Sequence, residues 1–205
     1  MANHLSGIAV CSCLVFIGAC AAPSPALRAN ADGNRAYLSG RLNEALSKYE
    51  LSLKLATESG DKQYAVIAMY GLARTNAKLC NSALAEDWFK KSIAARESLP
   101  DERYARLTQN LLEFARFLLA QGRVAEAIPL MDRAVPLLEG LGVEKSDPIA
   151  YANFYVDYAA ALKEAGRPAD AAVASSQAAR LRNANPGREA RFKAETYPTD
   201  CKPGK

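Results

Sequence analysis

Gly122-Arg123-Val124-Ala125-Glu126-Ala127 decides the fold of this chain, because its pattern recurs along the sequence. Residues 40–45 and 166–171 follow it closely, and residues 80–85 occupy the same slot. The last alanines of successive copies lie 40, 42 and 44 residues apart. A period in this range is typical of stacked two-helix units and not of one globular core.

Each unit is expected to hold two helices joined by this turn. In the third unit Leu111, Phe114 and Leu118 share one face of a helix, and Ala127 and Met131 continue an apolar stripe after the turn. The predicted hairpins cover about residues 32–60, 61–99, 101–142 and 147–185.

The turns explain the small residues. A helix that ends in a left-handed residue favours glycine, as at Gly40, Gly122 and Gly166. In the second unit Asn81 is the expected substitute, since asparagine tolerates this conformation. The alanines after each turn are expected where two helices cross closely.

A family resemblance follows from these residues. Gly40, Ala45, Tyr49 and Ser52, with large-small pairs such as Phe114-Ala115, resemble the tetratricopeptide repeat (TPR). The resemblance covers about residues 32–185. It implies an all-α, TPR-like solenoid of about four helix-turn-helix repeats that form a right-handed superhelix, although the period exceeds the usual ~34 residues. The alternative is an unrelated helical bundle with accidental periodicity.

The N-terminus carries an export pattern. Residues 5–19 hold no charged side chain and are too few for a membrane span, which needs ~20 residues. The following Ile17-Gly18-Ala19-Cys20 resembles the lipobox of bacterial lipoproteins, although no Lys or Arg precedes it. The resemblance implies a signal peptide over 1–19, acylation of Cys20, and a flexible linker over 20–31. The alternative is an ordinary signal peptide with an incidental cysteine.

The same resemblance implies a place in the cell. Ala21 stands where an aspartate retains lipoproteins at the inner membrane, so the expected site is the outer membrane of the bacterial envelope, on the periplasmic side.

Composition excludes several functions. The net charge of +4 has no basic block, so nucleic acid is not an expected partner. The single histidine, His4, lies in the signal segment, which leaves the mature chain without histidine-dependent catalysis or zinc sites. Helical carboxylates such as Glu113 are interpreted as solvated or paired charges. We therefore expect no enzyme, no metal and no cofactor.

Two cysteines would remain in the mature chain besides the acylated one. Cys80 and Cys201 form a possible disulfide in an oxidising compartment; the alternative is a small turn residue and a loose thiol. The tail, residues 186–205, is expected to be extended or disordered unless Phe192 and Tyr197 dock on the last helix.

The first helices of the hairpins are expected to line a concave groove. Polar and aromatic residues at related positions predict that it binds an extended peptide or a helix of another envelope protein. They are Asn34, Tyr37, Tyr70, Arg74, Gln109, Arg116, Asn153 and Lys163. The chain is thus predicted to be a non-enzymatic scaffold; the alternative is a lipoprotein that binds a lipid, a glycan or a peptidoglycan fragment.

Overall fold

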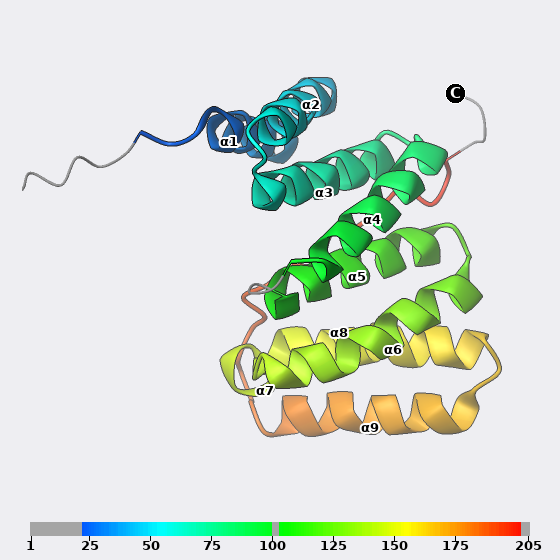
Figure 1. The fold of residues 1–205 in the computed structure, drawn as a ribbon. Helices are drawn as coiled ribbons and strands as arrows, with labels where there is room; N and C mark the ends of the chain where they lie inside the picture. Colours follow the sequence, from blue (N-terminus) through cyan, green and yellow to red (C-terminus); the bar gives the residue numbers. More distant parts are fainter. Residues whose placement is uncertain (1–21, 100–102, 202–205) are drawn as a thin grey trace, which may run out of the picture.

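The computed structural model describes residues 22–99 and 103–201, and within them the chain forms nine helices and no strand. The helices stack side by side along the molecule (Figure 1). They are α1 (Pro25–Leu38), α2 (Leu42–Glu58), α3 (Lys62–Lys78), α4 (Ser82–Glu97), α5 (Arg103–Ala120), α6 (Val124–Gly140), α7 (Val143–Ser146), α8 (Pro148–Glu164) and α9 (Pro168–Asn183).

The predicted fold is confirmed. Four hairpins, α1–α2, α3–α4, α5–α6 and α8–α9, follow one another with tight turns, and the short α7 lies in the last connection. The face formed by the first helices α1, α3, α5 and α8 is called the inner face below.

The N-terminal boundary differs from the prediction. A flexible linker was expected over residues 20–31, but α1 begins at Pro25. The Ser24 side chain accepts a hydrogen bond from the Leu27 N–H, and proline fits the first position of a helix. Ala26 is buried, and its carbonyl accepts a 2.9 Å hydrogen bond from the Ser52 hydroxyl of α2. These contacts keep the segment from Pro25 onward helical, although its composition suggested a flexible linker.

The repeat turns have left-handed residues, as expected for Gly40, Gly122 and Gly166, with φ of 73°, 69° and 73°. The second turn corrects the prediction, because Cys80 has φ 61° and Asn81 does not. Cys80 is the one non-glycine residue with positive φ among the described residues. Asn81 instead donates a 3.0 Å hydrogen bond to the Asn76 side chain.

The repeated residues fill the core. Ala45, Ala85 and Ala127 are fully buried, and so are the aromatic residues Tyr49 and Phe89. Tyr49 is held by three helices. A Cβ atom built on Gly33 of α1 would lie 2.8 Å from its ring, and one on Gly71 of α3 would lie 2.5 Å from it. The two glycines therefore let α1 and α3 close on the ring.

The chain after α9 returns across the molecule. It leaves α9, runs back past the preceding repeats and ends beside the α3–α4 turn (Figure 1). We call residues 188–201 the C-terminal strap; they contain no helix or strand. Docking on the last helix was the expected way to order this segment, but the strap reaches the middle of the solenoid.

Residues 1–21 lie outside the described residues, and with them the predicted signal peptide and Cys20. Among the helices from residue 22 onward, none is long and apolar enough to cross a bilayer.

Candidate peptide-binding groove on the inner face

Four of the predicted groove residues form a packed cluster at the N-terminal end. The Arg74 guanidinium donates 2.8 Å hydrogen bonds to Asn34 Oδ1 and to the Tyr49 hydroxyl. Its Cζ lies 4.0 Å from the ring centroid of Tyr37 and 5.5 Å from that of Tyr70. Such cation–π contacts strengthen when water is excluded. Arg74 is thus engaged within the fold and holds α1, α2 and α3 together.

The second predicted arginine is also engaged. Arg116 Nη1 donates a 3.1 Å hydrogen bond to Glu113 Oε1, and its side chain is 15% exposed. The Phe192 ring of the strap lies 5.8 Å from the guanidinium carbon. Glu113 itself is 1% exposed, so its charge is paired inside the protein, one of the two alternatives expected from sequence.

The strap is fixed near α9 by the start of α8. Asp147 Oδ2 accepts hydrogen bonds from the Arg191 N–H at 3.1 Å and the Phe192 N–H at 2.9 Å. The same carboxylate caps α8 by accepting from the Ala150 N–H. The Arg191 guanidinium donates to the Ser146 carbonyl. Asp147 therefore serves both as a helix cap and as a receptor for strap backbone.

Tyr197 is the central anchor of the strap. Its hydroxyl donates a 2.6 Å hydrogen bond to Glu113 Oε2, and the residue is 7% exposed. The ring stands edge-on to Phe117 of α5 and Phe89 of α4, with centroids 6.0 and 6.5 Å apart. Burial and the adjacent Glu113 carboxylate raise the pKa of Tyr197 well above its ordinary value, so the hydroxyl keeps its proton.

Glu113 is a buried acid at the bottom of this tyrosine pocket. Burial raises the pKa of Glu113, while the Tyr197 hydrogen bond and the Arg116 charge act in the opposite direction. A buried carboxylate without such partners would cost several kcal/mol, on the order of 3–5. The pocket is therefore built to receive a hydroxyl donor.

Lys78 of α3 binds the residues just before the anchor. Its Nζ donates a 2.6 Å hydrogen bond to the Thr196 carbonyl and lies 3.0 Å from Glu195 Oε2. The same carboxylate acts on Tyr37, whose pKa is raised by burial and by Glu195. Three consecutive strap residues are thus bound, the acid and the backbone carbonyl by Lys78 and the tyrosine by Glu113.

A disulfide ends the strap. Cys80 and Cys201 are bonded, and their Cα atoms lie 5.1 Å apart, within the usual range for a bridge. The bridge links the α3–α4 turn to the end of the described chain, 121 residues later. Both cysteines are partly exposed. The pair singled out in the sequence is therefore joined in the structure.

Two clefts remain open beside the strap. One of about 420 Å³ lies between α5 and α8 and has apolar walls that include Leu112, Phe154 and Phe192, with Gln109 and Arg116 also in its lining. The other, about 350 Å³, is lined by Asn153 and Arg116 and by strap residues. Three predicted residues, Gln109, Arg116 and Asn153, thus meet here, and the strap forms one wall.

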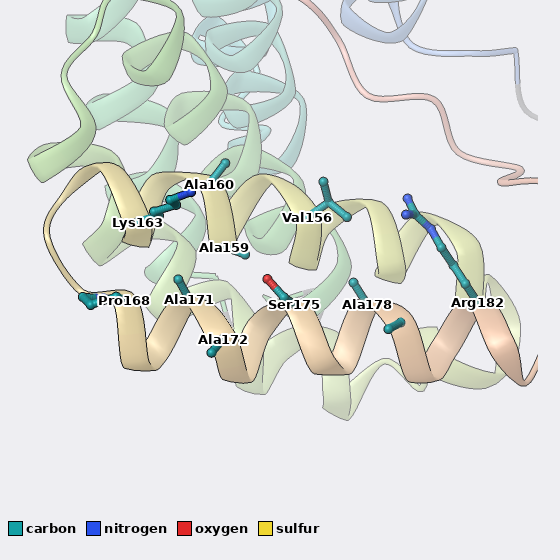
Figure 2. A pocket seen from close by; sticks show the side chains of 11 residues that line it. Val156, Ala159, Ala160, Lys163, Pro168, Ala171, Ala172, Ser175, Ala178 and Arg182 are labelled. Atoms are coloured by element: carbon teal, nitrogen blue, oxygen red, sulfur yellow. The ribbon is translucent and has the colours of Figure 1, made fainter.

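Lys163 is placed elsewhere. It lines a cavity of about 540 Å³ between α8 and α9, together with Val156, Ala160, Ser175 and Arg182 (Figure 2). This is the open end of the repeat stack, where a further hairpin would pack if the repeat continued. The predicted residues therefore divide into a structural cluster, an open cleft and this terminal face.

Sequence reasoning missed Glu113, Lys78 and Asp147 as receptors for the strap. One signal was available for Glu113, a lone carboxylate in the apolar run of residues 111–115. Asp147 stands directly before Pro148, a sequence typical of a helix start, and nothing local indicates its second role. The role of Lys78 depends on a partner 118 residues away and leaves no local signal.

Comparison with known proteins agrees with this architecture. The tetratricopeptide repeat family matches residues 29–98. Among solved structures, BtubC (BKLC) from P. vanneervenii superposes with a TM-score of 0.69 and 22% identity, covering 82% of this chain and 69% of that one.

A second similar structure is a putative kinesin light chain from Podosopora anserina with nearly identical TPR-like repeats. Its TM-score is 0.62 at 16% identity, with 82% of this chain and 79% of that chain covered. No curated protein matches the chain. The fold is thus an all-α, TPR-like repeat, an architecture that generally mediates protein–protein interaction and is typically non-enzymatic.

Proposed function

We propose that this chain is a non-enzymatic adaptor of the bacterial envelope that holds a partner protein by an extended segment on its inner face. One observation carries the proposal: the inner face already holds such a segment, the strap, through backbone, acid and tyrosine contacts. Peptide grooves combine backbone hydrogen bonds with pockets for individual side chains in this way.

The open cleft supplies the accessible part of the binding surface. Gln109 and Asn153 are exposed at its edges, and its walls are apolar. Interfaces of this kind bury aromatic or aliphatic anchors and satisfy polar groups at the rim. The partner is expected to place an apolar side chain between α5 and α8.

Site-specific photo-crosslinking in intact cells tests this surface. A photoreactive residue at Gln109 or Asn153 should capture one discrete protein, while the same residue at Ala94, exposed on α4, should not. Capture of the same proteins from all three positions, or of none from Gln109 and Asn153, would refute the assigned surface.

The adaptor is proposed to be anchored by a lipid on Cys20, and the sequence of residues 17–20 supports this. Cys20→Ser should move the protein from the membrane to the soluble fraction and abolish labelling with radioactive palmitate. Cys201→Ser is the matched control and should leave both unchanged. Ala21→Asp should shift the protein from the outer to the inner membrane, if residue 21 directs sorting. Retention of Cys20→Ser in the membrane fraction would exclude the anchor.

A second candidate function is ligand binding in the apolar cleft between α5 and α8, favoured by its volume of about 420 Å³. It predicts a lipid, a glycan or a peptidoglycan fragment that co-purifies and is detected by native mass spectrometry. Leu112→Glu should abolish that mass shift, and a mass of the bare chain from cells would exclude this function.

A further inference from the structure

We propose that the C-terminal strap is a tethered competitor for the partner segment, and that the Cys80–Cys201 disulfide keeps it in the groove. This inference rests on the proposed function. It also names the partner class: an extended segment with a tyrosine, and an acidic residue two positions before it. Glu195 and Tyr197 occupy these positions in the strap.

The receptor side fits that class. Glu113 lies at the bottom of the tyrosine pocket and accepts a hydrogen bond from the Tyr197 hydroxyl, whereas phenylalanine would leave the acid without this donor. Lys78 takes the acidic side chain and the carbonyl next to it. These contacts use a side-chain hydroxyl, a carboxylate and one backbone carbonyl, all of which a segment of another protein can supply.

The position of Cys80 supports a dedicated role for its thiol. It has φ 61° in a turn where the other repeats have glycine. A side chain in this conformation costs about 1 kcal/mol or more relative to glycine. The disulfide offsets this cost by fixing the far end of the strap.

Tethering decides the competition. While bridged, the strap is held at both ends, by α9 and by Cys80. Once reduced, its only covalent attachment is to α9, through the 13 residues between Asn183 and Tyr197. A flexible link of this length spans roughly 20 Å and gives an effective concentration on the order of millimolar. In the reduced chain a partner segment therefore competes with a strap that can dissociate from the groove. In the oxidised chain the disulfide closes the strap into a loop and keeps it there.

The switching step is a thiol–disulfide exchange with a dithiol reductant. One thiolate of the reductant attacks a sulfur of the bridge, forming a mixed disulfide and releasing the other cysteine, which takes a proton. The second thiol of the reductant then releases the remaining cysteine. Two electrons and two protons pass to Cys80 and Cys201, and the reductant leaves as a disulfide. The partial exposure of both cysteines gives the attacking thiolate access.

Peptide titration of the full chain tests the proposal. The probe is a fluorescent peptide with the sequence of residues 188–200, and its anisotropy is measured with the oxidised chain, the dithiothreitol-reduced chain and Cys201→Ser. The apparent Kd should be at least about tenfold lower for the reduced chain and for Cys201→Ser than for the oxidised chain. Cys201→Ser should not respond to dithiothreitol, and a probe with Tyr197→Ala should not bind.

The outcomes separate the two ideas. Equal affinity for the oxidised and reduced chains would overturn the role of the disulfide while leaving the groove a peptide receptor. Absence of binding to every chain, including Tyr197→Ala/Cys201→Ser with its strap weakened further, would overturn both this inference and the proposed function. Circular dichroism of each variant establishes that the helices are retained.

Discussion

Gly71→Ala should destabilise this protein, although alanine is the better helix former. Gly71 lies within α3, where the exchange by itself would favour the helix by about 0.8–1 kcal/mol. The new Cβ would lie 2.5 Å from two ring carbons of Tyr49, so the ring or the helix has to move.

Other contacts also restrain the ring. The α1 backbone is also close, since a Cβ on Gly33 would lie 2.8 Å from the same two ring carbons. Its hydroxyl is fixed by the hydrogen bonds to Asn34 and Arg74. Overpacking costs about 1–3 kcal/mol, and this site belongs at the upper end. After subtracting the gain in helix propensity, the free energy of unfolding should fall by about 2 kcal/mol.

Urea unfolding followed by far-ultraviolet circular dichroism measures this effect in the oxidised chain. With a slope near 2 kcal/mol per molar urea, the midpoint should fall by about 1 M. Gly140→Ala is the control, because it lies at the end of α6 with no atom within 4 Å of the added Cβ, and it should be neutral or stabilising. A Gly71→Ala chain as stable as the wild type would refute the account of Tyr49 as a wedge between two glycines.

Three further predictions concern the strap and the repeat contacts. Cys201→Ser should lower the free energy of unfolding by up to about 5 kcal/mol in the chain-entropy model, because a link across 121 residues is lost. If dithiothreitol does not cause the same loss of stability in the wild type, the lost disulfide is not its cause. Tyr197→Phe should cost about 1.5–3 kcal/mol, since the buried Glu113 loses its donor, and should speed hydrogen exchange of the strap, whereas the exposed Thr199→Ala should change neither. Glu86→Gln should cost about 0.5–1 kcal/mol at neutral pH, because Arg123 bonds this carboxylate and lowers its pKa from 4.5 to about 2. A carboxyl group whose pKa is lowered by folding stabilises the folded state at pH values above its unfolded-state pKa. The difference in unfolding free energy between Glu86→Gln and the wild type should therefore be complete above pH 4.5 and vanish as the pH falls through about 2. A difference independent of pH would exclude the ion pair as its source.

Local chemistry made much of the architecture predictable. Glycine at the left-handed turns and buried alanine after them recur because each repeat meets the same steric demand. The same regularity led to one error, since Asn81 was expected at a position that Cys80 occupies. The start of α1 was also missed, because Ser24 and Pro25 form a helix cap within a segment whose composition suggested a linker.

The groove was predictable only in part. Sequence alignment of the repeats indicated which residues share the inner face, but not which of them are already engaged. Arg74 and Arg116 stand at equivalent repeat positions, and the first lies among tyrosines while the second binds a buried acid. Their availability depends on neighbours from other helices, which a single repeat does not specify.

The sequence by itself determined the helical hairpins, their number, their turns and the pair of cysteines able to join, because these depend on residues a few positions apart or on simple counting. Only the tertiary structure decided what occupies the inner face. Residues 188–201 have no periodicity of their own, and their course is set by Asp147, Glu113, Lys78 and Cys80 from separate repeats. Contacts over such sequence distances arise only once the solenoid has brought their receptors onto one surface.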